Sequence, residues 1–416
     1  MGYLVGFAAA LGYLLFIPAG RSHLTHVWAE DGARFLVDAL AQPMSTNLVT
    51  PYAGYLHLVP RLSAQLIALL PLPLASVGLA IVAATLRAGI AVLVFAASGG
   101  HIRTAWIRLG LASAVVLLPA GNAETLDNLA NLHWFLLFGA FWALLWRPAH
   151  RWQNVLTALV LFLAAASSPL VLGLAPLAAA RVPLPRWRDR LPTIGFGVGA
   201  AAQVTALLGA ARLAYSAQPF DPRQGALAGL MRVPLMMFSG PDPVPWLYQR
   251  FGYAPALVAL AVTLALVGIA VARGRPVGRF LGLAGLVAAA SLTAVELIVN
   301  WSPVLEVDEP GVVVAGQRYS IAPCLFLLTA VAAGLDALPD RGYPQAAVRL
   351  AVPAVIGVAI AWQLQLGSGQ LTGPSWRTAV SDATRQCADG RPTATIVHNP
   401  PGWFFGLACT TLLTPK

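Results

Sequence analysis

Long runs of hydrophobic residues recur along the chain, and short polar segments separate them. A helix of about 17 to 25 apolar residues crosses the hydrocarbon core of a bilayer and satisfies its own backbone hydrogen bonds there. The runs predict these spanning segments: Tyr3–Ala19, Ser76–Ser98, Ala105–Ala120, His133–Trp146, Thr193–Ala211, Ala254–Ala272, Phe280–Asn300, Tyr319–Leu338 and Leu350–Leu366.

A longer apolar stretch, Asn154–Ala180, has arginines at both ends and Ser167-Ser168-Pro169 at its centre. Since proline interrupts a helix, we expect a short helical hairpin that enters and leaves the membrane on the same side. The chain is thereby predicted to be an all-α polytopic membrane protein with about ten or eleven transmembrane helices. Residues 1–366 form this transmembrane domain, and residues 367–416 form a small polar C-terminal tail.

The long amphipathic stretch Arg21–Leu74 follows the first span, and two arrangements of it fit the rest of the chain. In one, residues 21–74 are an outer loop and Leu56–Leu70 lies along the membrane surface. In the other, Leu56–Leu70 spans the membrane and the loop before it is cytoplasmic. We favour the interfacial helix, because the segment is short for a span and carries polar residues at i, i+4 and i+8 on one face.

Composition and charge agree with a membrane environment. Hydrophobic residues make up 58% of the 416 residues and charged residues only 10%, whereas soluble domains carry about 25% charged residues. The net charge of +10 comes from arginines clustered in short segments between the apolar runs. No basic stripe interleaved with aromatic residues is present, so the sequence argues against nucleic-acid binding.

The charged segments alternate in sign from one span end to the next. Short basic loops lie on the cytoplasmic side of a membrane. The basic set is Arg103, Arg108, Arg147, Arg151, Arg181, Arg186, Arg188, Arg190, Arg273, Arg275, Arg279, Arg341 and Arg349. The acidic set is Glu124, Asp127, Asp221, Asp242, Glu306, Asp308, Glu309, Asp382 and Asp389. We therefore place the acidic segments and the tail outside a multi-pass cell inner (plasma) membrane.

Candidate chemistry begins with two adjacent acids, Glu30 and Asp31, just after the first span. They precede a short amphipathic helix predicted over Asp31–Gln42. A carboxylate at the boundary between water and lipid can take a proton from an acceptor hydroxyl or hold a divalent cation. The alternative interpretation is that Asp31 only caps the helix.

Further along the same loop, Tyr55, His57 and Arg61 lie close together in the sequence. Tyrosine offers a stacking face for a sugar, and arginine offers a two-pronged donor for a phosphate. The alternative is an aromatic belt with snorkelling basic residues, which many membrane proteins have.

The second outer loop is rich in amide, carboxylate and aromatic side chains, a combination typical of carbohydrate-binding surfaces. Its candidate ligand-binding residues are Glu124, Asp127, Asn128, Asn131, His133 and Trp134. Asn128 and Asn131 are three positions apart, so they share one face of a helix. The alternative is a solvated loop with ordinary capping asparagines.

Two arginines stand apart from the cytoplasmic clusters. Arg318, next to Tyr319, is the basic residue of an otherwise acidic outer loop and could grip the phosphate of a lipid-linked donor; the alternative is an ion pair with Glu306, Asp308 or Glu309. Arg87 lies within a predicted span, where a charge indicates function unless it pairs structurally, for example with Glu296.

The three cysteines show no metal-binding spacing. Cys387 and Cys409 both lie in the tail, so they are a disulfide candidate if the tail is outside the cell. Cys324 lies within an apolar run and is interpreted as inert.

The arrangement resembles the GT-C superfamily of membrane glycosyltransferases. The resemblance depends on the acidic pair in Trp28-Ala29-Glu30-Asp31-Gly32 and on two membrane-parallel helices in the same loop, Asp31–Gln42 and Leu56–Leu70. The segment Pro51–Arg61 is similar in placement to a Pro-Tyr-containing segment of bacterial members. Many members have Asp-Glu where this chain has Glu-Asp.

The resemblance implies transfer of a sugar from a polyprenyl-phosphate-linked donor to a cell-envelope glycan, lipid or protein acceptor on the extracytoplasmic face. It implies that Asp31, or Glu30 as second choice, acts as base near a divalent cation such as Mg or Mn. From the positions of these residues we expect a single displacement, which would invert the anomeric carbon. Arg318, with Arg61, would hold the donor phosphate. The rival interpretation is a transporter or flippase for a polyprenyl-linked glycan, and a third is a non-catalytic scaffold.

Overall fold

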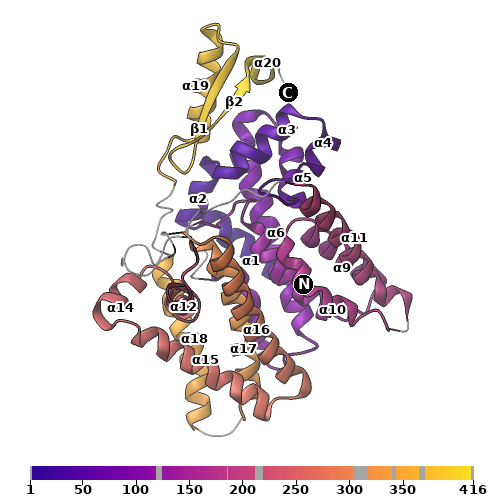
Figure 1. Cartoon of the computed structure of the whole chain (residues 1–416), viewed down its shortest axis with the longest axis vertical. Coiled ribbons are helices and arrows are strands. Elements are labelled where there is room, and N and C mark those ends of the chain that lie inside the picture. The colour runs from indigo at the N-terminus through magenta and orange to yellow at the C-terminus, as the bar shows by residue number, and fades with distance from the viewer. Residues whose placement is uncertain are drawn as a thin grey trace.

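The structure, a computed structural model, describes residues 2–118, 124–184, 186–210, 219–302, 305, 316–339, 343–364 and 371–413. These residues are mostly helical, with one two-stranded sheet near the C-terminus (Figure 1). The elements of the first half are α1 (Gly2–Phe16), α2 (Pro18–Thr25), η1 (Asp31–Leu36), α3 (Val37–Ala41), α4 (Met44–Val49), α5 (Leu58–Ile67), η2 (Leu72–Leu74), α6 (Ala75–Ser98), α7 (Ala105–Leu117), α8 (Leu132–Leu145), α9 (Arg151–Ala165), η4 (Pro169–Leu174), α10 (Ala175–Ala179) and α11 (Trp187–Gly209). Those of the second half are α12 (Pro222–Leu230), η5 (Met231–Leu235), α13 (Met236–Ser239), α14 (Val244–Phe251), α15 (Ala254–Arg273), α16 (Pro276–Val299), α17 (Arg318–Ala337), α18 (Tyr343–Gln363), α19 (Trp376–Ala388), β1 (Thr393–His398), β2 (Trp403–Ala408) and α20 (Cys409–Leu413).

Six helices of the described residues are long and apolar enough to cross a membrane: α6 with η2, α11, α15, α16, α17 and α18. The pair α1–α2, bent by 72° at Pro18, would add a seventh. Fewer spanning helices are therefore seen than the ten or so that hydropathy predicts. The difference lies in α7, α8 and α9, whose 13 to 15 residues rise only about 20 to 23 Å. The fold is that of an all-α polytopic membrane protein.

Helix α17 lies at the centre of the bundle, and 94% of its most apolar 18-residue stretch is buried. It packs against α15 and α16 through small residues that allow close approach of the backbones. A Cβ at Gly285 of α16 would lie 2.6 Å from the Phe326 carbonyl oxygen of α17, and Gly334 of α17 lies directly against Leu266 of α15. This packing determines the position of Arg318, the first residue of α17.

The predicted hairpin is present: α9 ends at Ala165, and η4 with α10 returns after the serine-proline break. Its two ends lie together, because the Arg181 guanidinium donates to the carbonyl oxygens of Leu144 and Trp146, both at 2.7 Å. The chain therefore enters and leaves this hairpin at one end of the bundle.

The segment Leu56–Leu70 forms only the short helix α5, whose ten residues rise about 15 Å and cannot cross a bilayer. The start of α5 is anchored to the hairpin apex, since the amide of Val59 donates to the Ser167 hydroxyl at 2.9 Å. Helix η1 is a π-helix that continues directly into α3, so the predicted helix over Asp31–Gln42 is also present.

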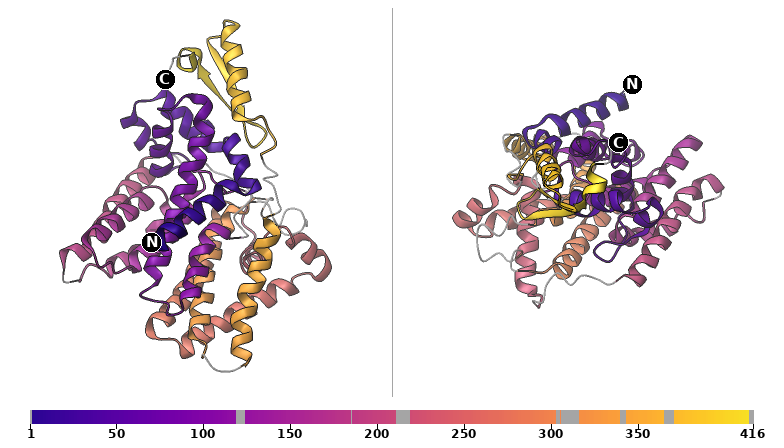
Figure 2. Two further views of the ribbon diagram at one scale, coloured as in Figure 1. Left: turned by 180° about the vertical axis from the view of Figure 1, so that it is seen from behind. Right: turned by 90° about the horizontal axis from the view of Figure 1, so that it is seen from above.

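The tail is a small unit of α19, β1, β2 and α20, in which β1 and β2 pair antiparallel. The predicted disulfide between Cys387 and Cys409 is confirmed. The unit projects from one end of the long axis in Figure 1, at the opposite end from the connection between α15 and α16, and Figure 2 shows the same arrangement from behind. It contacts the first loop where the Asn399 amide donates to the Val27 carbonyl oxygen at 3.2 Å.

We predict that replacing both Cys387 and Cys409 by serine loosens the tail. The disulfide closes a loop between residues 22 positions apart, and its loss should lower the stability of the tail unit by about 3 kcal/mol. Limited proteolysis of the purified full chain measures this as faster cleavage within α19 and β1. The control is Cys324→Ala, which retains the cross-link; equal protection of the tail in all three proteins would contradict the prediction.

Candidate functional site

Asp31 joins the first loop, residues 21–74, to the second loop, which contains Leu129 and Ala130. Its side chain is only 2% exposed, and its two oxygens accept hydrogen bonds from the amides of Leu129 and Ala130, both at 2.8 Å. Because these amides precede α8, the carboxylate determines where the second loop lies relative to η1. Asp31 thus has a structural role that its place at a helix start did not reveal.

Burial raises the pKa of the Asp31 carboxyl to about 7, although the two amide hydrogen bonds act to lower it. The neighbouring Glu30 carboxylate contributes to the rise. Desolvation disfavours the charged form of any buried acid, so the direction follows from the burial. Asp31 therefore changes its protonation state near neutral pH.

Glu30 is the open member of the acidic pair. Its side chain is partly exposed and makes no hydrogen bond within the described residues. It lies within electrostatic range of both Asp31 and Arg318. A carboxylate with free oxygens next to a cation is placed to meet a polar ligand.

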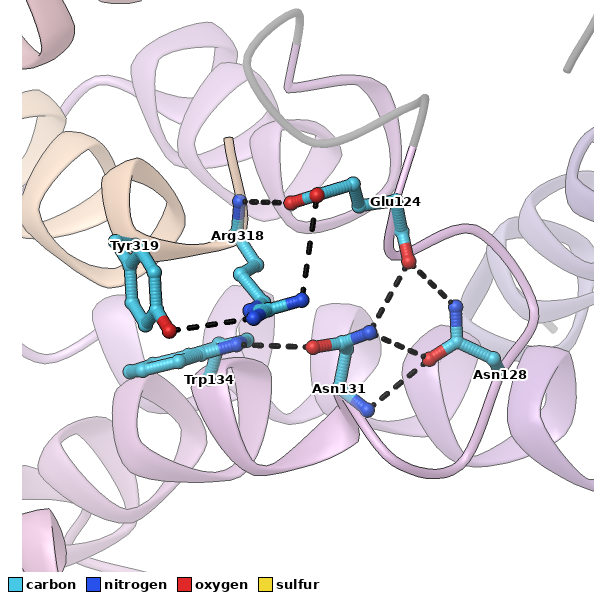
Figure 3. A network of polar contacts seen from close by, with 6 residues as sticks. All are labelled: Glu124, Asn128, Asn131, Trp134, Arg318 and Tyr319. Carbon is cyan, nitrogen blue, oxygen red and sulfur yellow. Dashed lines mark hydrogen bonds and ion pairs between the residues drawn. The ribbon is translucent and has the colours of Figure 1, made fainter. Parts of the chain in front are cut away.

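Amide side chains shape the second loop (Figure 3). The Asn128 and Asn131 side chains both donate to the Glu124 carbonyl oxygen, at 2.8 and 3.1 Å. Asn131 also donates to Asn128 at 3.0 Å and accepts from the Trp134 indole at 3.4 Å. These contacts favour the interpretation that both asparagines order the loop, since most of their hydrogen-bonding groups are already engaged.

Arg318 at the start of α17 pairs with Glu124 (Figure 3). Its amide donates to the Glu124 carboxylate at 2.9 Å, and its guanidinium lies 4.0 Å from the other carboxylate oxygen. The guanidinium also donates to the Tyr319 hydroxyl at 3.2 Å and remains 34% exposed. The acids that the sequence suggested as partners, Glu306, Asp308 and Glu309, lie outside the described residues.

A second arginine, Arg232 of η5, lies behind this pair. It is 2% exposed and within electrostatic range of Glu124 and Tyr319. The sequence analysis missed it, although an arginine within an apolar stretch is the signal that singled out Arg87. Two guanidinium groups from the far half of the chain therefore lie within electrostatic range of Glu124 in the second loop.

Aromatic rings form a continuous row beside the acidic pair. Tyr55 stacks on His57 with ring centroids 4.1 Å apart, and the next separations are 6.5 Å to His133, 4.2 Å to Trp134 and 6.0 Å to Tyr319. Burial lowers the pKa of His57 well below its usual value, so this imidazole is neutral. The row brings predicted site residues from both loops and from α17 into mutual contact.

Arg61 is used inside the first loop. It is 1% exposed, pairs with Asp38 at 2.9 Å and donates to the Asn47 side chain. Any phosphate bound by Arg61 would compete with Asp38 for the guanidinium.

Arg87 does not pair with Glu296, so that suggestion from the sequence is wrong. Its guanidinium donates to the carbonyl oxygens of Val115 and Val116, at 2.7 and 3.2 Å. These carbonyls lie at the end of α7, where helix termini leave acceptors unpaired. Arg87 also lies within electrostatic range of Asp127, a buried loop residue with a φ of 47° whose pKa burial raises to about 8.

Within the described residues, no group of three or more His, Cys, Asp or Glu side chains converges in a way that could hold a metal ion. The Asp31 oxygens are already engaged by amides. The described side chains therefore do not fit the divalent cation that the resemblance implied.

The bundle and this polar network define an all-α membrane protein with a polar cluster built from its first two loops and the start of α17. No protein-family model, curated protein or solved structure matches the chain.

We predict that Asp31→Ala destabilises the protein, because the amides of Leu129 and Ala130 lose their acceptor in a buried site. The cost should be about 3 kcal/mol, measured as a lower midpoint of thermal unfolding in detergent. Asp31→Asn, which keeps one acceptor, should cost less. The exposed Asp382→Ala is the control, and an unfolding midpoint for Asp31→Ala equal to that of the control would contradict the prediction.

We also predict a pH dependence that belongs to Asp31. A carboxyl whose pKa rises from 3.8 to about 7 on folding contributes stability that is fully present below pH 3.8 and is lost as the pH rises through about 7. The unfolding midpoint should therefore fall between pH 4.5 and about pH 8 more steeply in the native protein than in Asp31→Asn. Identical slopes in the two proteins would count against a raised pKa; Asp127 contributes equally to both.

Proposed function

We propose that the chain is a membrane glycosyltransferase that moves a sugar from a polyprenyl-phosphate-linked donor to a cell-envelope acceptor on the extracytoplasmic face. The observation that carries the proposal is the polar connection from the acidic pair, through the second loop and Glu124, to Arg318. A proton acceptor and a phosphate-binding cation are the two groups that such a transfer requires.

Glu30 is the better candidate for the base. Its oxygens are open, whereas both oxygens of Asp31 hold the second loop. Glu30 takes the proton of the acceptor hydroxyl as the oxygen attacks the anomeric carbon of the sugar. Asp31 acts through the loop and positions Glu124 and Arg318.

Arg318 holds the leaving phosphate. As the bond between the anomeric carbon and the phosphate oxygen breaks, negative charge grows on the polyprenyl phosphate, and a nearby guanidinium stabilises it. Attack from the face opposite the phosphate inverts the anomeric centre in a single displacement. No step is routed through a metal ion.

The bundle offers a place for the polyprenyl chain. A groove of about 370 Å³ lies between α7, α17 and α18 and is lined almost entirely by apolar side chains, among them those from Trp106 to Leu117 on α7. We further propose that the short apolar helices also enter the membrane, which brings the number of transmembrane helices to about ten or eleven. The basic connections between them then lie in the cytoplasm. The polar cluster and the tail then face outward.

The rival interpretation, a flippase for a polyprenyl-linked glycan, uses the same arginines and has no need of a proton acceptor. A transfer assay therefore separates the two. In the flippase interpretation, the acidic pair can be neutralised without loss of lipid translocation.

We predict that Glu30→Gln lowers sugar transfer by about 10²- to 10⁴-fold, the range that general-base catalysis contributes, with its unfolding midpoint unchanged. The assay follows a labelled sugar from polyprenyl phosphate into cell-envelope fractions, using the full chain in vesicles. Asp382→Asn is the matched control in the tail. Undiminished transfer by Glu30→Gln would remove Glu30 from the mechanism. A native protein that translocates the lipid-linked glycan but transfers no sugar would favour the flippase.

A further inference from the structure

A polar cavity whose lining residues are distinct from those of the Arg318 cluster lies beside Arg34 of η1. Its volume is about 410 Å³, and its walls are Arg34, the turn Pro51–Gly54, and Gly209 and Ala210 at the end of α11. It thus lies between the first outer loop and the end of a spanning helix, outside the network already described.

Arg34 gives this cavity a positive charge. The residue is exposed, follows Asp31 on η1, and has its guanidinium carbon 5.6 Å from the centre of the Tyr52 ring. Asp38, the nearest acid on the following turn, is already paired with Arg61. Within the described residues, Arg34 therefore has an aromatic neighbour and no carboxylate, which suits it to bind an external anion.

The turn at the mouth of the cavity is built to hold Tyr52 in place. Tyr52 and Tyr55 exchange backbone hydrogen bonds of 2.9 and 3.1 Å across a two-residue reversal. Ala53 there has a φ of 52°, a left-handed conformation that is strained for alanine and is found where a specific geometry is needed. The Tyr52 ring is also braced by Phe35 and His57, at centroid distances of 6.1 and 5.5 Å.

The surroundings of Arg34 resemble those of Arg318, because each guanidinium lies beside a tyrosine ring. Arg318 lies 5.0 Å from the centre of the Tyr319 ring, as Arg34 does over Tyr52. The row of rings through His57, His133 and Trp134 joins the two tyrosines. A transferase needs one position for the donor and another for the acceptor, and this row of rings has an arginine beside the tyrosine at each end.

Resting on the proposed function, we infer that the Arg34–Tyr52 cavity binds the phosphate headgroup of a lipid acceptor, while Arg318 serves the donor. A lipid is favoured over free phosphate because the cavity borders α11, where Leu208, next to Gly209, is 84% exposed. In a bilayer that side chain meets acyl chains, so a headgroup in the cavity leaves its tails beside α11.

Binding to the purified full chain tests this inference without any transfer reaction. The probes are dioctanoyl phosphatidylglycerol, dioctanoylglycerol, which lacks the phosphate, and inorganic phosphate. We expect the phosphatidylglycerol to bind the native chain, Glu30→Gln and Arg318→Gln with similar Kd. Arg34→Gln should weaken binding at least tenfold and Arg34→Lys by less. Arg223→Gln, an exposed arginine on α12, is the matched control.

The inference is overturned if Arg34→Gln binds as well as Arg223→Gln, if only Arg318→Gln loses binding, or if dioctanoylglycerol binds equally well. Inorganic phosphate that binds as tightly as the lipid would overturn the lipid assignment. Because Glu30→Gln keeps the cavity, lipid binding that depends on Arg34 supports the inference even where sugar transfer fails. Failure of the proposed function is thereby distinguished from failure of the binding site.

Discussion

The Asp31 carboxylate is the contact on which the polar cluster depends. Two acceptor oxygens, buried with the amides of Leu129 and Ala130, hold η1 against the second loop. This anchor fixes η1 relative to the loop that carries Glu124, and Glu124 in turn pairs with Arg318. Burial raises the pKa of Asp31 to about 7. The residue that positions the second loop therefore also changes its protonation state near neutral pH.

The C-terminal tail also holds the segment Val27–Asp31, which contains the acidic pair. The amide of Asn399 and its carbonyl oxygen pair with Val27 and Ala29, just before Glu30. Space at Gly32 is small, because a Cβ at this position would lie 3.0 Å from the Val27 side chain and 3.1 Å from the His398 imidazole. A disulfide stiffens the tail, so the segment lies between two independent supports, and only Glu30 remains open between them.

Rigidity and chemistry are divided between neighbouring residues. Asp31, Asn128 and Arg61 are buried and use their hydrogen-bonding groups within the protein. Glu30, Arg34 and Arg318 keep part of their side chains exposed. This division explains why adjacent residues of similar type have different roles: burial engages one in structure, and exposure leaves the next available to a ligand.

The sequence by itself determined the membrane class, the hairpin, the short helices of the first loop and the disulfide, because hydropathy, proline and cysteine act through local pattern and composition. It also identified most members of the cluster as residue types. Only the tertiary structure decided which acid is buried and which is open, that Arg318 pairs with Glu124, and that Arg61 is engaged by Asp38. It also revealed Arg232 and the Arg34 cavity. These depend on contacts between segments that are far apart in the chain, where desolvation and pairing are set by neighbours that no local pattern specifies.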